Sequence, residues 1–220
     1  MARHFRFRIA CLHADAPDLY RRSGARCIRS TQDHDVEMTN TLKGHFLVPT
    51  TNNPDTGLWF IFHHEAEGLL AIDLTKPHPD IPYRHFESVL EGEDNKPRSE
   101  RIVLLGGPMQ PDTSMIVLHN DLHAVGDNHV INDDFRFLSY RFVLLPGHPP
   151  QITKADDTPT RINMQGGGDF LITMGFRLFD MDALEKELQD WQWTILPATP
   201  DIVFFTPHKE RLEKARRSIN

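Results

Sequence analysis

Histidine is the residue type with the greatest capacity for chemistry in this sequence, since 13 of the 220 residues are histidine. A neutral imidazole can bind a metal or move a proton near neutral pH. The tightest groupings are His63 and His64 with Glu67, and His119 with His123. Neighbouring strand residues point to opposite faces, and turn-forming residues around His123 predict a loop rather than a helical face. We therefore predict no metal site.

A second candidate site is the stretch VLLGGPMQPDTSMIVLH, residues 103–119. Gly106, Gly107 and Pro108 form a rigid corner between two apolar runs, and His119 ends the second run. A strand follows this corner, so no helix N-terminus is present to attract a phosphate. The freedom of glycine and the fixed φ of proline predict a structural turn, with close approach to a ligand as the alternative. The triplet Gly166–Gly168 also precedes a strand and predicts a flexible loop.

Nucleophilic catalysis has little support in the sequence. No G-x-S-x-G motif is present, and Ser88, Ser114 and Ser139 lie in no acid–base context. Both cysteines, Cys11 and Cys27, fall in the first 40 residues, which excludes a cysteine nucleophile or ligand from the rest of the chain. We predict no catalytic residues and no cofactor.

Charge limits the partners that this chain can bind. The net charge is −7 at pH 7, and the remainder of the chain is more acidic than that because the first 40 residues are rich in arginine. Nucleic-acid affinity depends on Lys and Arg that displace counterions, and no helix-turn-helix, ribbon or zinc-finger pattern is present. The sequence therefore predicts no specific DNA site. It contains no apolar run long enough to cross a bilayer, and we expect a cytoplasmic protein without membrane contact.

Two regions differ in character. Residues 1–40 show no sustained periodicity, and we expect an Arg-containing extension that is mobile or lies over the body. Organelle targeting by this segment is a secondary interpretation that its acidic residues disfavour. Residues 41–220 are expected to form one domain. Short apolar runs bounded by Gly, Pro, Asn or Asp predict strands in this domain, and they cover residues 45–48, 58–62, 69–74, 102–105, 115–118, 142–145, 170–176, 193–196 and 202–205.

Helical patterns are fewer. The best covers DMDALEKELQDWQW, residues 180–193, with Asp180 or Asp182 as the N-cap. A last helix is predicted after Thr206, with its Lys and Arg side chains on a solvated face, and PYRHFESVL at 82–90 gives a weaker helical pattern. Loops are expected at 91–100 and 146–161. Because strands outnumber helices without alternating with them, the fold class is α+β.

Four stretches carry a family resemblance. They are LKGHFLVPT, HEAEGLLAIDLTKP, the Gly-Gly-Pro stretch that ends in Leu-His, and the C-terminal run MGFRLFDMDALEKELQDWQWTILPATPDIVFFTP. In this order and spacing they resemble the YqgE/AlgH family over about residues 41–217. The resemblance implies a single α+β domain with a branched, strongly curved mixed sheet resembling a partial barrel, with flanking helices.

The sequence also departs from the family pattern. The usual Tyr-Ile-Cys-Glu-His reads Phe60-Ile61-Phe62-His63-His64, so Phe62 replaces the family cysteine. A redox role for that cysteine is therefore not expected here. His64 corresponds to the family's histidine, which makes it the better candidate of the two neighbouring histidines for a polar site.

Two functions follow as expectations. The favoured one is a non-enzymatic regulatory or interaction protein that acts through a protein partner, because the resemblance links the family to transcriptional regulation. The alternative is a small-ligand-binding protein or enzyme with a polar site near the corner, formed by five residues: His64, Gly106, Gly107, Pro108 and His119.

Overall fold

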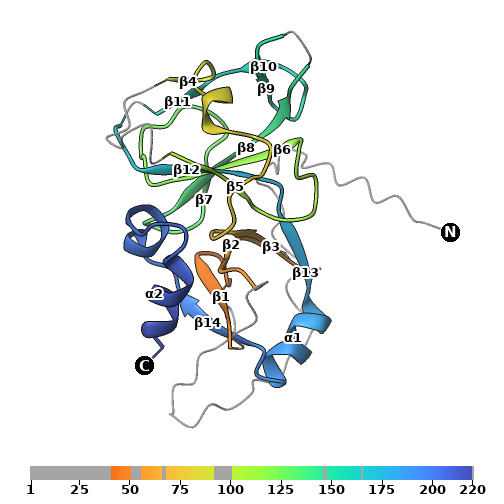
Figure 1. The fold of residues 1–220 in the computed structure, drawn as a ribbon, viewed down its shortest axis with the longest axis vertical. Helices are drawn as coiled ribbons and strands as arrows, with labels where there is room; N and C mark the ends of the chain where they lie inside the picture. The colour runs from red at the N-terminus through yellow and green to blue at the C-terminus, as the bar shows by residue number, and fades with distance from the viewer. Residues whose placement is uncertain are drawn as a thin grey trace, which may run out of the picture. The chain divides into compact units, whose positions relative to one another are not determined.

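A computed structural model describes residues 41–50, 56–65, 68–91, 101–145, 148–164 and 166–219. Leu42–Asn220 form one compact unit that contains two main β-sheets (Figure 1). The predicted extension over residues 1–40 lies outside the described residues, as does the predicted loop over 91–100 apart from Glu91.

The first sheet has five strands, all antiparallel, in the order β13-β3-β2-β1-β14. Its members are β1 (His45–Pro49), β2 (Trp59–Glu65), β3 (Gly68–Asp73), β13 (Arg177–Asp180) and β14 (Trp193–Pro197). β1 and β2 are buried on both faces along most of their length, which explains their continuous apolar sequences. The first strand of the sheet along the chain therefore pairs directly with the last.

The second sheet has seven strands and is mixed. Its order is β10-β9-β8-β6-β12-β5, and β7 pairs with β8 outside this path. Its members are β5 (Val103–Leu105), β6 (Ser114–His119), β7 (His129–Val130), β8 (Arg136–Val143), β9 (Gln151–Thr153), β10 (Pro159–Thr160) and β12 (Phe170–Met174). Only the β5–β12 pair is parallel. A small third sheet pairs β4 (Leu90–Glu91) with β11 (Ile162–Asn163).

The two main sheets share one continuous segment of chain. β12 lies in the seven-stranded sheet, Gly175 adopts φ +73°, and β13 then lies in the five-stranded sheet. Figure 1 shows this passage between the upper and lower sheets. The sheets are curved and do not close into a barrel. The predicted α+β domain with a branched, curved mixed sheet is thus confirmed.

The main hydrophobic core lies between the two sheets. Phe60 of β2 contacts Phe135 at a ring-centroid distance of 5.1 Å, and Phe62 contacts Phe137 of β8 at 5.0 Å. Ile116 and Leu118 of β6 are fully buried in the same cluster. Burying each such side chain stabilises the fold by about 1.5–3 kcal/mol. Phe62, which replaces the family cysteine, is therefore a core residue.

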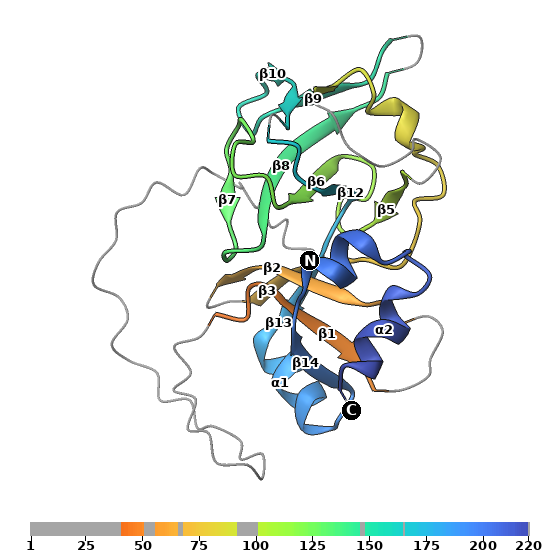
Figure 2. The ribbon, with the colours of Figure 1, turned by 90° about the vertical axis from the view of Figure 1, so that its left-hand side faces the viewer.

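Two further clusters cover the outer faces of the sheets. Met115 and Val117 of β6 alternate with the main-core residues and belong to the cluster outside the seven-stranded sheet. Ile61 and Leu69 belong to the cluster outside the five-stranded sheet, which helix α1 covers (Figure 2). The layers therefore follow the order outer cluster, sheet, main core, sheet, outer cluster.

The helix predictions are confirmed in part. Helix α1 (Met181–Gln189) begins after Asp180, whose side chain accepts a hydrogen bond from Ala183 N at 3.0 Å. Helix α2 (Arg211–Arg217) packs beside β1 (Figure 2). The prediction that this helix begins directly after Thr206 is wrong, because residues 207–210 form a turn and α2 begins only after Glu210. The predicted strand at 202–205 is also wrong: Asp201–Phe205 form a π-helical turn that buries three consecutive apolar residues.

Other differences concern short elements. The pattern at 82–90 forms only a 3₁₀ turn, Tyr83–His85, before β4 begins. β8 is longer than the predicted strand at 142–145, and β9 and β10 lie within the predicted loop at 146–161. Leu105 and Leu188, which belong to a predicted strand and a predicted helix, are only partly buried. No helix in the described part of the chain is long and apolar enough to cross a membrane.

Candidate functional site

The Gly-Gly-Pro corner lies where the two main sheets meet. Gly106 N donates to Met174 O at 2.7 Å, and Asp73 N at the end of β3 donates to Gly106 O at 2.8 Å. On the other side of the corner, Met109 and Phe176 exchange two backbone hydrogen bonds at 2.9 and 3.1 Å. The corner therefore joins β5 and β12 of one sheet to β3 and β13 of the other.

Close backbone approach accounts for the two glycines. A Cβ atom at Gly106 would clash with Gly175 O, and one at Gly107 would clash with the carbonyl group of Phe176. A Cβ at Gly175 would lie 2.6 Å from Gly107 O. Pro108 is exposed. These contacts are between backbone segments of the chain itself, and ligand binding at the corner stays a prediction.

His64 lies near the end of β2, on the outer side of the five-stranded sheet. Its strand partner is Leu69, and its Nδ1 accepts a hydrogen bond from Leu42 N at 3.1 Å. Burial lowers the pKa of His64, and the nearby charge of Lys43 lowers it further. The hydrogen bond requires an unprotonated Nδ1, so His64 acts as an acceptor in the fold.

His119, the last residue of β6, is fully buried on the outer face of the seven-stranded sheet. Neither Nδ1 nor Nε2 forms a hydrogen bond of ordinary geometry with the described protein groups, although the Asp121 backbone and the Asn128 side chain lie close enough to raise the pKa of the imidazole. Burial lowers its pKa to about 4, although the negative charge of Asp121 opposes part of this effect. The positive charge of Arg136 adds to the lowering. His119 is therefore a neutral, buried imidazole at physiological pH.

Two other polar groups near His119 also lack partners. Arg136 of β8 is directly opposite His119 in the sheet register, and one of its terminal guanidinium nitrogens, Nη1, is buried without a hydrogen bond. Asn128 lies close enough to favour the charged form of the imidazole, but its buried Oδ1 makes no hydrogen bond of ordinary geometry. Buried polar groups are nearly always paired, so three unpaired groups in one place mark an unusual site.

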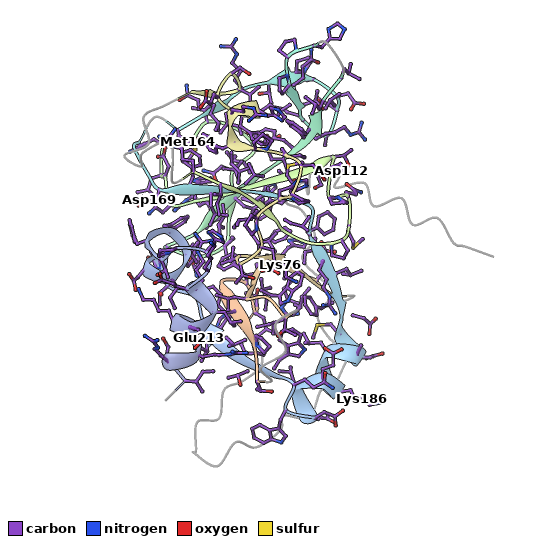
Figure 3. All side chains as sticks on the ribbon, viewed as in Figure 1. Lys76, Asp112, Met164, Asp169, Lys186 and Glu213 are labelled. Carbon is purple, nitrogen blue, oxygen red and sulfur yellow. The ribbon has the colours of Figure 1, made fainter. Side chains whose placement is uncertain are left out.

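The segment after β6 covers this site and is held by side-chain oxygens. Asp121, itself buried, accepts hydrogen bonds from His123 N at 2.7 Å and Gly166 N at 2.9 Å. Asn120 Oδ1 accepts one from Asp169 N at 2.7 Å; Figure 3 labels Asp169 next to β12. The glycine triplet predicted as a flexible loop is thus anchored at both ends to the residues that follow His119.

The predicted site residues do not form one site. The corner lies near Ser114, whose carbonyl oxygen accepts from Gly175 N, whereas His119 is at the other end of β6, roughly 17 Å away for an extended strand. His64 lies on the outer face of the opposite sheet, with the main core between it and His119. Figure 3 shows that side chains fill the space between the two sheets.

Sequence analysis missed Asn128 and Arg136. A signal for Arg136 exists in its alternation with Leu138 and Tyr140, which places all three on one face of β8. No three His, Cys, Asp or Glu side chains in the described ranges are grouped closely enough to hold a metal ion. His63 instead pairs with Glu65, with 2.7 Å between Nε2 and Oε1.

Comparison with known proteins decides the family. The family model described as AlgH-like matches residues 55–220. This chain belongs to the AlgH-like family. The match includes β2 to α2 and so contains the corner, His64 and His119.

Relatives of this AlgH-like protein span most of its length. A UPF0301 protein of Pseudoalteromonas translucida is 27% identical over 181 residues, which cover 80% of this chain and 89% of that protein. UPF0301 protein YqgE of Salmonella newport is 28% identical over 189 residues, covering 81% and 91%. The chain is thus similar to proteins that carry a family label rather than a described activity.

Two solved structures have the same fold as this AlgH-like chain. The solution structure of AlgH from Pseudomonas aeruginosa matches with a TM-score of 0.55 and 20% identity, covering 86% of this chain and 93% of that one. Protein DIP2367 from Corynebacterium diphtheriae matches with a TM-score of 0.54 and 14% identity, covering 83% and 90%. At these identities the likeness concerns the fold alone.

Proposed function

We propose that this AlgH-like chain is a non-enzymatic regulatory or interaction protein that acts by binding a protein partner. The observation that carries the proposal is a group of exposed apolar side chains on residues 122–130. Leu122, Val125 and Val130 are 66%, 54% and 62% exposed, although the chain has a full core in which to bury such residues. Several exposed apolar side chains on one short segment can provide an interaction surface. We call these three residues the apolar segment surface.

The backbone beneath this surface is held in place. Val125 N donates to Asn163 O at 3.0 Å, and Val130 lies in β7, which pairs with β8. The ring of His129 stacks on Phe137 with centroids 4.7 Å apart. A surface fixed in this way loses little conformational entropy on binding, which favours affinity.

The resemblance to a family linked with transcriptional regulation fits an indirect role. An acidic chain with a net charge of −7 is poorly suited to phosphate contacts, so we propose that regulation passes through a protein partner in the cytoplasm rather than through a specific DNA site. No particular partner follows from the geometry.

The test is affinity capture from extract of the protein's own cells, with quantitative comparison of three baits. They are the wild-type chain, a variant with Leu122→Ser, Val125→Ser and Val130→Ser, and a control with Leu144→Ser and Leu145→Ser. The control removes two apolar side chains that are 47% and 52% exposed and directly follow the end of β8. We expect a partner that the wild type and the control retain and the triple variant loses.

Two results would contradict the proposal at different levels. Equal capture by all three baits would show that the apolar segment surface is not the binding site. Absence of any protein enriched by the wild type would argue against a partner-binding function. Each variant must first show the same cooperative thermal unfolding as the wild type, so that loss of binding is not loss of fold.

A further inference from the structure

Unpaired polar groups lie together beside the segment of residues 120–128, which contributes one of them. His119 is fully buried with both ring nitrogens unpaired, Asn128 Oδ1 is buried and unpaired, and so is one terminal nitrogen of Arg136. His119 and Arg136 are direct neighbours across the β6–β8 pair. A chain that folds stably does not usually bury several such groups in one place without something for them to bind.

The neighbouring protein groups do not give these atoms hydrogen bonds of ordinary geometry, although the Asp121 backbone and the Asn128 side chain approach the imidazole. Asp121 is the nearest buried carboxylate, but its two oxygens already accept backbone N–H groups from His123 and Gly166. Nη1 of Arg136 forms no hydrogen bond with any group in the described ranges. The guanidinium therefore remains a positive charge with an open donor that points away from solvent.

The donors present define the chemistry of the missing partner. Arginine always carries its charge and offers planar, paired N–H donors that match the two oxygens of a carboxylate. A neutral imidazole can donate from one nitrogen while the other accepts. An oxyanion would therefore pair with Arg136 and His119 together, and Asn128 could present either end of its amide to it, since the two ends are exchanged by a simple rotation.

The surrounding charges favour a single negative charge on the ligand. Asp121 is buried and its charge acts on His119, as its effect on the pKa of the imidazole shows. Asp127 lies on the covering segment, and its charge acts on the nearby Tyr140. A dianion such as phosphate would be repelled by both carboxylates more strongly than a monoanion.

We propose that Arg136, His119 and Asn128 form a binding site for a small carboxylate monoanion, closed by residues 120–128. Arg136 and His119 donate to the carboxylate oxygens, and the amide of Asn128 fixes the ligand's orientation. The cover is anchored at Asp121 and at the Val125–Asn163 bridge, and between them Gly126 adopts φ +143° against the hydroxyl of Tyr140. The site does not depend on the apolar segment surface, since His119 and Arg136 lie on β6 and β8 and Asn128 is not one of the three residues of that surface.

The first test uses the full wild-type chain labelled with ¹⁵N. Sodium formate and sodium acetate are titrated at constant ionic strength, with sodium chloride as the reference, while the His119 ring nitrogens and the backbone amides of 120–128 are followed by NMR. We expect saturable shifts at His119 and in this segment with both carboxylates. Shifts identical to those in chloride would overturn the site.

The second test uses variants. Arg136→Gln removes the charge, and we expect about tenfold or greater weakening of acetate binding, as for loss of a charge-assisted hydrogen bond. Arg141→Gln is the matched control, because Arg141 lies on the same strand but is exposed and pairs with Asp157 at 2.6 Å; its acetate affinity should match the wild type within about twofold. Equal weakening in both variants would contradict a specific site.

Two further arms keep the proposal open to failure. If Arg136→Gln does not fold, Arg136→Lys keeps the charge and loses the planar fork, and weaker acetate binding is again expected. Inorganic phosphate at the same ionic strength tests the ligand class, and binding equal to or tighter than that of acetate would overturn the carboxylate assignment. Since these titrations use the purified chain alone, their failure is separate from failure of the partner-binding proposal.

Discussion

Arg211 of α2 donates a hydrogen bond from Nη1 to the carbonyl oxygen of Leu74, at a distance of 2.8 Å and 137 residues away in the sequence. Its Nε donates to Thr206 O at 3.0 Å, and the residue is only 6% exposed. Burial lowers the pKa of Arg211 to about 10, so it still carries its charge at neutral pH. The residue therefore fastens the C-terminal helix to the end of β3 through carbonyl groups.

This contact predicts that Arg211→Ala lowers the free energy of unfolding by about 2–4 kcal/mol, since it removes packing and leaves buried carbonyls unpaired. Arg217 is an exposed residue at the end of the same helix, and Arg217→Ala should alter the free energy of unfolding by less than about 0.5 kcal/mol. Urea denaturation measures both. Similar losses in the two variants would contradict the role assigned to Arg211.

Gly175 and Gly167 form a natural pair for testing the junction of the sheets. Both adopt positive φ, +73° and +66°, but a Cβ at Gly175 would meet Gly107 O at 2.6 Å, whereas one at Gly167 would meet nothing within 4 Å. Gly167→Ala should cost about 1 kcal/mol, from backbone strain alone. Gly175→Ala should cost at least about 2 kcal/mol more because backbone must also move. Equal losses in thermal or urea unfolding would show that the close approach is unimportant.

The buried His119 predicts loss of stability in mild acid. Its pKa is about 4 in the folded chain, whereas an unfolded histidine titrates near 6.5. The unfolded state therefore takes up a proton first, and stability falls as the pH drops from about 6.5 towards 4, by up to about 3 kcal/mol. Above pH 6.5 this contribution is fully present.

The measurement is urea unfolding at pH 7, 5.5 and 4.5 for the wild type and for His119→Gln. The variant cannot take up this proton, so its stability should fall less over the same range. Parallel pH profiles for the two proteins would show that His119 does not have the lowered pKa assigned to it.

Phe62 predicts the consequence of restoring the cysteine that the family pattern has at this position. The ring is 3% exposed and packs on Phe137, so Phe62→Cys leaves a cavity in the main core. A loss of about 2–4 kcal/mol in the free energy of unfolding is expected. Phe62→Leu, which keeps more of the volume, should lose less. An unchanged stability in Phe62→Cys would mean that the core closes around the smaller side chain.

DNA binding gives a prediction about function. The purified chain should show no preference between a candidate duplex and a scrambled one, and any binding should weaken steeply with salt. The C-terminal helix is a poor reader of bases because Arg211 is buried and Arg216 is bonded to Glu213 at 3.1 Å. Fluorescence anisotropy at near-physiological salt is the measurement. Nanomolar binding that discriminates the two duplexes would restore a direct role in transcription.

Sequence analysis predicted most strands because their apolar runs end at turn-forming residues, and it predicted α1 because the Asp180 cap is a local interaction. It failed at Ile202–Phe205, where an apolar run typical of a strand forms a helical turn. In that case the choice depends on the core that the segment meets, and no local pattern reports it. The prediction that the Arg side chains of the last helix are solvated failed at Arg211 for a similar reason, since its acceptor at Leu74 is distant in sequence.

In the candidate site, too, the local features could be predicted from the sequence and the long-range ones could not. The corner glycines could be predicted to shape the backbone, because glycine and proline act locally. The grouping of Asn128 and Arg136 with His119 could not, since it depends on the register of β6 against β8 and on the path of the segment between them. His64 and His119 were predicted to share one site, and only the order of the layers in the fold shows that they lie on opposite sides of the main core.

The order of the five-stranded sheet has a consequence for synthesis on the ribosome. β1 is among the first described segments to be made, yet one of its two neighbours, β14, is among the last. At about 5–20 residues per second, the edge of β1 that β14 will cover waits roughly 7–30 s for its partner. During that time an apolar strand with an unpaired edge is open to wrong pairing. Nascent chains halted before residue 193 should therefore recruit chaperones more strongly than those halted after release of α2.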